Sequence, residues 1–258
     1  MAEQPIEGMN AVEWVRHKRP FPHIAATNVF DREFYQGMDR QFQDMLGRGL
    51  SETAVHGPFM RMASYDAYGI SFDGSLTGNL RVFISLAWHN WITSLFEVRG
   101  TGHIYAGAHH HKAGSASGKI HSDYNSAWFP AHDAGEIRFP NHSQCAYKTG
   151  AGPLLPAEKV QVFRAVAMIF YLHNDGWEEG MGGETGLFDS RKAPVDQPCV
   201  RIAPRNNSMV LFECRPRSYH AFLHNPGAPR NSIIMWAHRT REDALSRWPA
   251  SGEERWRA

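Results

Sequence analysis

The sequence predicts a mainly β fold, a double-sheet jelly roll buttressed by helices that come before it. Apolar residues at helical spacing occur within the first hundred residues, and after that point the chain changes to short β-like runs separated by Gly, Pro, Asn and Asp. Many short strands of this kind are typical of jelly rolls. Helices that precede the strands are expected to cover one of the two sheets.

Two amphipathic segments in the first part of the chain are expected to be helices that pack on a sheet. In the first, 31–50, Asp31 can cap the N-terminus. Its apolar residues recur at spacings of three or four: Phe34, Met38, Phe42, Met45 and Leu46. The second, 80–96, carries a broad apolar stripe: Phe83, Leu86, Trp91, Leu95 and Phe96.

The clearest strands follow in the second half of the chain and are bounded by turn residues: Val162–Leu172, Cys199–Ala203, Ser208–Phe212, Ser218–Leu223 and Asn231–His238. Residues 106–119 and 128–158 carry no clear pattern. Loops of this length are often lids or binding loops, so we expect both at the mouth of a site, with flexible surface that has no such role as the alternative. The three histidines at 109–111 could suggest a metal site, but adjacent side chains on a strand point to opposite faces and seldom bind one ion. We therefore expect these histidines to be exposed or part of a lid.

Length and composition favour a single domain spanning 1–258, with a helical part over about 1–97, a jelly-roll core over about 98–240 and a C-terminal tail. The net charge of +1 gives no electrostatic footprint for nucleic acid or an acidic membrane. Three separated cysteines indicate reduced thiols in a cytoplasmic protein. The start of the chain, 1–5, does not resemble a signal peptide, and no run is long enough to span a bilayer.

His121-Ser122-Asp123 is the first candidate metal motif. On an extended segment, residues two apart point to the same face, so His121 and Asp123 can bind one ion. With 15 histidines, roughly one His-x-Asp match is expected by chance, and His173-Asn174-Asp175 is a second one. We favour the first pair because the second runs straight into a turn.

A third ligand must come from a distant strand. His220 lies inside the predicted strand 218–223 and is the leading candidate, with His224 as the alternative. Two imidazoles and one carboxylate can bind Fe(II) on one face and leave the opposite face open, as in non-haem oxygenases. Taken alone, His220 would more often be a buried core histidine than a ligand.

Arg230 opens an apolar strand and therefore needs an anionic partner, because an unpaired buried charge is costly. A guanidinium binds a carboxylate through two points, so Arg230 can hold a dicarboxylate cosubstrate such as 2-oxoglutarate. A salt bridge to a protein carboxylate is the alternative interpretation.

The stretch 164–177, which reads RAVAMIFYLHNDGW, and the following Gly182-Gly183-Glu184-Thr185 resemble the centre of the prolyl-hydroxylase-like branch of the Fe(II)/2-oxoglutarate-dependent dioxygenases. Segments 202–204 and 210–212, followed by Ser218, His220 and Arg230, resemble the subsequent strands of that family in order and spacing. The similarity covers roughly residues 100–240, with a fainter likeness near Pro20.

The resemblance implies a double-stranded β-helix, which binds Fe(II) through His121, Asp123 and His220 and 2-oxoglutarate through Arg230. It further implies that Tyr171 donates a hydrogen bond to the same distal carboxylate and that Tyr105 lines the cosubstrate pocket. Ala167 departs from the Thr or Asn usual in relatives, which removes one polar contact.

The leading hypothesis is an oxygenase that hydroxylates an unactivated C–H of a small molecule, or carries out a related oxidation such as desaturation or ring closure. The reaction is coupled to decarboxylation of 2-oxoglutarate to succinate, with O2 as oxidant. A protein hydroxylase acting on prolyl or other side chains is the second hypothesis. The third is a jelly-roll metal-binding module or isomerase without oxygen chemistry. A nucleic-acid demethylase is disfavoured, because such relatives carry a second arginine where this chain has Trp236.

Overall fold

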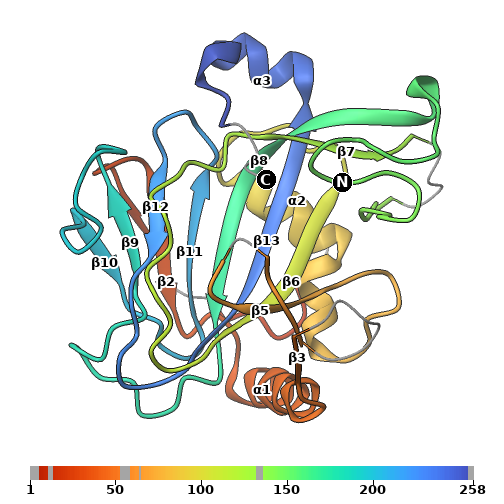
Figure 1. Cartoon of the computed structure of the whole chain (residues 1–258). Coiled ribbons are helices and arrows are strands. Elements are labelled where there is room, and N and C mark those ends of the chain that lie inside the picture. The colour runs from red at the N-terminus through yellow and green to blue at the C-terminus, as the bar shows by residue number, and fades with distance from the viewer. Residues whose placement is uncertain (1–5, 11–13, 53–58, 64, 132–135, 255–258) are drawn as a thin grey trace.

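Two β-sheets form the centre of the molecule in the computed structural model, which describes residues 6–10, 14–52, 59–63, 65–131 and 136–254 (Figure 1). The strands of the large sheet are β1 (Val15–His17), β2 (His23–Thr27), β3 (Leu50–Ser51), β4 (Phe59–Arg61), β5 (Tyr68–Ser71), β6 (Ile104–His111), β7 (Ser126–Pro130), β8 (Lys159–Tyr171), β11 (Ser208–Glu213) and β13 (Arg230–Thr240). The strands of the small sheet are β9 (Thr185–Phe188), β10 (Val200–Ile202) and β12 (Tyr219–Phe222).

Strand order confirms the predicted jelly roll. The large sheet runs β1-β2-β11-β8-β13-β6-β5-β4-β3, with β7 paired to one end of β8, and the small sheet runs β10-β9-β12. Most pairs are antiparallel and join strands that are distant in sequence, as in β13 with β6. A further antiparallel bridge between His121 and His220 extends the small sheet towards the metal motif.

One face of the large sheet is covered by helices and the other lines a cavity. The helices are α1 (Arg32–Gly47) and α2 (Leu86–Ser94), with the 3₁₀ helix η1 (Asn79–Ile84) between them. Along β13, Ile233, Met235 and Ala237 belong to the apolar core under these helices. The alternate residues Ile234 and Trp236 line the cavity on the opposite face, as the two-residue period of a strand requires.

Both predicted helices are present, and the second is divided. The side chain of Asp31 caps α1 by accepting a hydrogen bond from the Phe34 amide at 2.8 Å. Residues 80–96 form η1 and then α2, because Ser85 is extended and its hydroxyl accepts from the Trp88 amide to begin a new helix. The other helical segments are η2 (Pro156–Glu158), α3 (Arg241–Arg247) and η3 (Ala250–Gly252).

The two stretches expected to be loops each contain a strand. Residues 106–111 belong to β6, which lies between β5 and β13, and 126–130 form β7. The expectation for the histidines was therefore wrong, because His110 and His111 are buried on β6 and His109 lines the cavity. The described part of 1–97 also contains five short strands beside its helices.

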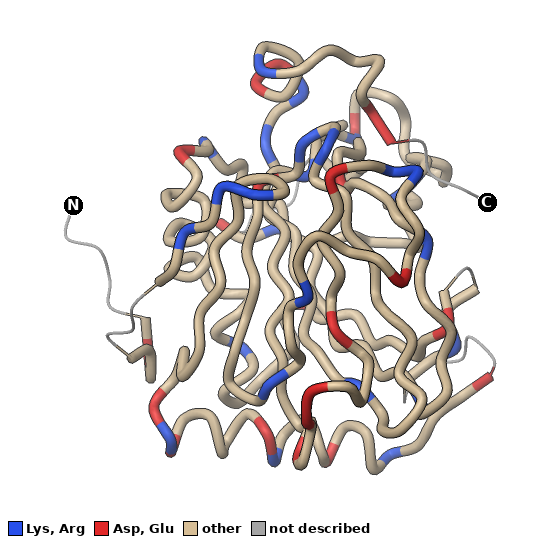
Figure 2. Tube along the Cα trace, turned by 90° about the vertical axis from the view of Figure 1, so that its left-hand side faces the viewer, with Lys and Arg blue, Asp and Glu red and all other residues tan. Residues whose placement is uncertain are grey.

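Charged residues of both signs are spread over the molecule, and both signs occur along α1 (Figure 2). No helix among the described residues is both long and apolar enough to cross a membrane. The terminal segment 1–5, on which the expectation about a signal peptide was based, lies outside the described residues.

Candidate functional site

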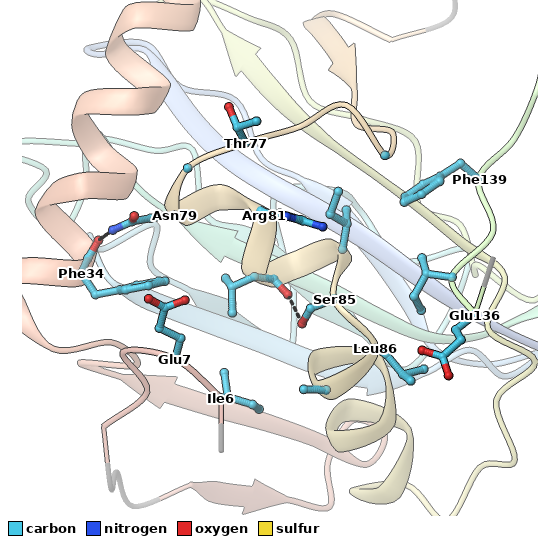
Figure 3. Close-up of a pocket in the computed structure, with 16 residues that line it drawn as sticks. Ile6, Glu7, Phe34, Thr77, Asn79, Arg81, Ser85, Leu86, Glu136 and Phe139 are labelled. Carbon is cyan, nitrogen blue, oxygen red and sulfur yellow. Dashed lines mark hydrogen bonds between the residues drawn. The ribbon is translucent and has the colours of Figure 1, made fainter. Parts of the chain in front are cut away.

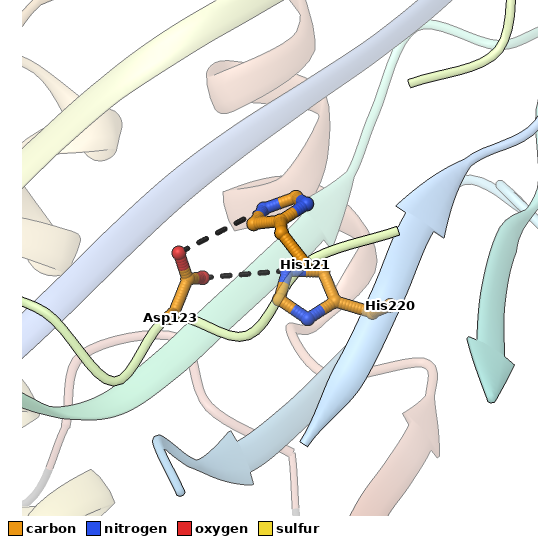
Figure 4. Close-up of side chains that lie close together, drawn as sticks. All are labelled: His121, Asp123 and His220. Atoms are coloured by element: carbon orange, nitrogen blue, oxygen red, sulfur yellow. Dashed lines mark ion pairs between the residues drawn. The ribbon is translucent and has the colours of Figure 1, made fainter. Parts of the chain in front are cut away.

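His121, Asp123 and His220 meet in the cavity between the two sheets (Figure 4). Among the described residues they form a group in which one ligand atom of each lies within 4.8 Å of the others. The Asp123 Oδ2 atom is 3.3 Å from His220 Nε2, and Asp123 Oδ1 is 3.8 Å from His121 Nε2. The backbone bridge between the two histidines, with N–O distances of 3.1 and 2.9 Å, brings the distant segments together.

The tautomers of both histidines suit a metal ion. The Nδ1 atoms of His121 and His220 lie 2.8 and 2.9 Å from the carbonyl oxygens of Lys119 and Ser218, so Nδ1 must carry the proton and donate it. In a neutral ring Nε2 then carries a lone pair, and both Nε2 atoms face the Asp123 carboxylate. Three electron-rich groups therefore converge, and a cation at their centre would satisfy all three.

Electrostatics keep these groups in the form that binds a metal. Burial alone would raise the pKa of Asp123, but the Arg164 guanidinium and the two imidazoles hold that pKa well below its ordinary value. Burial lowers the pKa of His121, and His220 beside it lowers this pKa further. The His121 side chain is 41% exposed, and it lines the cavity.

Arg164 and Trp236 orient the Asp123 carboxylate. The Arg164 guanidinium donates to Oδ1 at 2.5 Å, and the Trp236 indole donates to Oδ2 at 2.7 Å. The guanidinium also lies 3.6 Å from the centre of the Trp236 ring. A β-bulge between β8 and β13 makes Ala165 the extra residue, so that Arg164 lies opposite His238 and faces the cavity.

Sequence reasoning missed the role of Arg164, although a signal was present. Arg164 lies within the apolar run Val162–Leu172, and it is buried in the structure. A buried guanidinium requires an anion, and this holds for Arg164 as it does for Arg230. Its anion is Asp123, 41 residues away in the sequence.

Arg230 is buried in the same cavity, where its polar contacts are to hydroxyl groups. It donates to Ser232 Oγ at 2.9 Å and to Thr185 Oγ1 at 3.2 Å. Its Nε has no hydrogen-bond partner among the described residues, and no described carboxylate forms an ion pair with it. The described part of the chain thus gives no support to the alternative of a protein salt bridge.

The two tyrosines of the predicted cosubstrate pocket lie in different places. Tyr171 is fully buried beside Arg230, whose guanidinium lies 5.1 Å from its ring centre, and its hydroxyl donates to Thr185 Oγ1 at 2.6 Å. Tyr105 also lines the cavity, but on β6 it pairs with Trp236 of β13. Trp236 is six residues from Arg230 along β13, so Tyr105 lies away from Arg230. Its hydroxyl lies 3.0 Å from Ser71 Oγ.

The alternative ligands are engaged elsewhere. His173 Nδ1 lies 3.2 Å from Asp39, and Asp175 accepts a hydrogen bond from Asn206. His224 Nδ1 donates to the carbonyl oxygen of Ser115 at 2.8 Å. The structure therefore brings together the leading three candidates, His121, Asp123 and His220.

The cavity that holds the site measures about 750 Å³. A second cavity of about 800 Å³ lies against η1, on the helical side of the molecule, and is lined by residues such as Phe34, Arg81 and Glu136 (Figure 3). Neither the three candidate ligands nor Arg230 belongs to it, so the first cavity is the candidate active site.

Comparison with known proteins agrees with this geometry. A profile of the 2OG-Fe(II) oxygenase superfamily matches residues 107–238. A prolyl 3,4-dihydroxylase from Ostreococcus tauri is 26% identical over 245 residues, covering 92% of this chain and 41% of the relative. The chain thus spans about two fifths of the length of that relative.

Solved structures show the same fold at low sequence identity. A prolyl-4-hydroxylase from Pseudomonas putida is 13% identical with a TM-score of 0.51, covering 91% of this chain and 96% of that one. A prolyl hydroxylase from Trichoplax adhaerens, in complex with a peptide of hypoxia inducible factor, is 16% identical with a TM-score of 0.53, covering 87% of this chain and 86% of that one.

The matched profile covers half of the chain, including β8, β12 and most of β6 and β13, the strands around the cavity. Its position agrees with the clustering of two histidines and a carboxylate beside a buried arginine. The chain therefore belongs to the 2OG-Fe(II) oxygenase superfamily, whose members are dioxygenases that use Fe(II), 2-oxoglutarate and O2.

Proposed function

We propose that His121, Asp123 and His220 bind Fe(II), that Arg230 binds 2-oxoglutarate, and that the enzyme hydroxylates a side chain of a protein substrate, a prolyl residue first of all. The observation that carries this proposal is the shared cavity. Three converging ligand groups and a buried guanidinium without a carboxylate partner among the described residues open into the same 750 Å³ space.

The cosubstrate fits the surroundings of Arg230. A guanidinium forms strong paired hydrogen bonds with a carboxylate, and the Ser232 and Thr185 hydroxyl groups beside it can also donate to one. Tyr171 donates a hydrogen bond to the Thr185 hydroxyl and thereby orients it. Ala167 on the same face of β8 leaves room where a larger polar residue would contact the cosubstrate.

The remaining residues of the cavity would orient the metal ligands. Arg164 and Trp236 each occupy one oxygen of Asp123, which fixes the direction in which the carboxylate presents its remaining lone pairs. Bound Fe(II) and 2-oxoglutarate together supply the activation of O2 that oxidises an unactivated C–H. The protein fixes the ligands and orients the substrate.

We favour a protein substrate, although the leading hypothesis from the sequence was a small molecule. The relatives described above carry the names of prolyl hydroxylases, and one is described with a bound peptide. The cavity wall beyond the ligands is aromatic, formed by Tyr105, Tyr147 and Trp236. Aromatic faces of this kind suit the apolar ring of proline.

Anaerobic addition of Fe(II) and 2-oxoglutarate tests the cofactor assignment. We expect a metal-to-ligand charge-transfer band, followed by succinate when O2 is admitted. The His220→Ala variant should lose both signals because one of the three ligands is missing. A wild-type protein without the band, or an undiminished band in that variant, would refute the assignment.

Peptides that contain proline test the substrate class. We expect succinate formation coupled to the gain of one oxygen atom on a proline-containing peptide or protein, and no such gain on the same sequence with alanine in place of proline. A panel of free amino acids and sugars serves as the competing arm. Coupled hydroxylation in that panel alone would return the small-molecule hypothesis to first place.

Replacement of Arg230 by alanine should raise the KM for 2-oxoglutarate about a hundredfold, because charge-assisted hydrogen bonds to a carboxylate are lost. The Arg230→Lys variant should recover part of the affinity, since it restores charge without two-point geometry. Arg48→Ala, which removes an exposed cation after α1, is the matched control. An unchanged KM in Arg230→Ala would show that 2-oxoglutarate is bound elsewhere and would overturn the role assigned to Arg230.

A further inference from the structure

The segment that carries two of the three candidate metal ligands has few strand partners. Between β6 and β7, residues 121–125 make one bridge to the small sheet, at His121, and then leave it. Buried backbone groups require hydrogen-bond partners, and Ser122, Asp123, Tyr124 and Asn125 are all buried. Their partners therefore decide how firmly the ligands are held.

The segment that follows α3 supplies several of these partners, mainly through Glu254. The Ser122 amide and hydroxyl each donate to Glu254 Oε2 at 3.3 Å. The Glu254 amide donates to the Tyr124 carbonyl at 2.8 Å, and its own carbonyl accepts from the Asn125 side chain. The neighbouring Glu253 accepts a hydrogen bond from the Ser126 amide at 3.0 Å. Glu254 thus contacts the residue that separates His121 from Asp123.

This C-terminal segment, residues 248–254, is itself anchored at several points. The Tyr124 hydroxyl lies 3.3 Å from the carbonyls of Ala244 and Trp248, and the Tyr124 and Trp248 rings are in edge contact with centres 5.7 Å apart. Arg191, which follows β9, forms an ion pair with Glu254 Oε1 at 2.5 Å. The Glu254 side chain is only 11% exposed and lines the active-site cavity.

We propose that Glu254 is a positioning residue for the metal site, and that the C-terminal segment fixes the loop that presents His121 and Asp123. Glu254 acts through Ser122: one carboxylate oxygen holds the motif between its two ligands and the other is held by Arg191. This inference rests on the proposed function, because it takes His121 and Asp123 to be ligands.

Loss of this contact should weaken metal binding without unfolding the protein. A free loop must lose conformational entropy when its ligands close around an ion, and the loss of groups that orient ligands typically weakens metal binding tenfold or more. Glu254→Gln keeps an oxygen that can accept from Ser122 but cannot form the ion pair with Arg191, so it should weaken metal binding less than Glu254→Ala does. Arg191→Ala removes the same ion pair and should likewise have an intermediate effect.

Anaerobic titration with Fe(II), and with Co(II) as a stable probe, measures the effect directly. We expect the Kd of Glu254→Ala to rise about tenfold or more and that of Glu254→Gln to rise less. Glu158→Ala is the matched control, since its carboxylate also accepts from a backbone amide, that of Leu155, but at an exposed turn. Equal Kd values for Glu254→Ala and wild type would overturn the inference.

Two further measurements keep the outcomes separate. Unfolding of the metal-free proteins shows whether Glu254→Ala is folded. If it is not, Arg191→Ala and Glu254→Gln decide the question, and equal metal affinity in wild type and Arg191→Ala would then count against the inference. Failure of the proposed function itself would be visible in the wild type, as absence of metal binding or of succinate. A rise in Kd with normal 2-oxoglutarate affinity at saturating metal supports a role at the ligands.

Discussion

Asp123 shows how one carboxylate can be buried and still be available to a metal. Each of its oxygens accepts a hydrogen bond from a fixed donor, Arg164 on one side and Trp236 on the other. These donors stabilise the charged form, so burial does not neutralise the group. Because each oxygen has further lone pairs, coordination is possible without breaking either hydrogen bond.

We expect Trp236→Phe to weaken metal binding tenfold to about a hundredfold, the range seen when groups behind metal ligands are removed. The substitution keeps an aromatic ring but deletes the indole N–H that orients Oδ2. Anaerobic titration with Fe(II) measures the change in Kd, and Trp91→Phe in α2 is a control that removes an indole from the opposite side of the sheet. Equal weakening in both variants would show that the effect is not specific to Asp123.

At the level of elements, the long strands β8 and β13 organise the site. Their outward residues pack under the helices, and the inward residues of β13 include Arg230 at its start and Trp236 near its middle. The bulge at Ala165 restores the inward direction for Arg164. The helices provide stability to this sheet without contributing to the ligand set.

Removal of the α1 cap separates these two roles. We expect Asp31→Ala to lower the free energy of unfolding by about 1 kcal/mol, because the Phe34 amide loses its acceptor. Asp31→Asn should retain most of the stability, since asparagine caps about as well. Urea unfolding followed by circular dichroism measures both changes. If fully folded Asp31→Ala formed less succinate than the wild type, the helices would contribute to the site as well as to stability, contrary to this prediction.

The whole molecule buries many neutral imidazoles. Among the described residues, burial lowers the pKa of eight buried or half-buried histidines, to about 4 for His103 and about 3 for His109, where nearby arginines contribute as well. In the unfolded chain these groups take up protons near their ordinary pKa of about 6.5. Below that pH the unfolded state therefore binds more protons than the folded state.

The free energy of unfolding of the metal-free protein should therefore fall as the pH drops below about 6.5. Each such histidine contributes up to about 1.4 kcal/mol per pH unit until the pH reaches its folded pKa, which is about 4 for His103. Urea unfolding at a series of pH values measures the slope. His103→Gln should flatten it, whereas replacement of the exposed His17 should not. A stability independent of pH over this range would contradict the prediction.

Local patterns in the sequence determined the jelly-roll class, α1 with its Asp31 cap, most strands after residue 160, and the candidates His121, Asp123, His220 and Arg230. These features depend on short-range spacing, such as three or four residues in a helix and two in a strand. The same rules failed for β6, whose Gly-, Ala- and His-rich residues form a strand because β5 and β13 pair with it on both sides.

Only the tertiary structure decided which groups surround these candidates. The bulge that turns Arg164 towards Asp123 depends on pairing with β13, and Thr185 reaches Arg230 from the other sheet. Glu254 meets Ser122 across 132 residues of sequence. Such contacts join residues that are far apart in sequence and meet because the two sheets and a terminal segment pack together. Packing of this kind leaves no periodic pattern in the sequence.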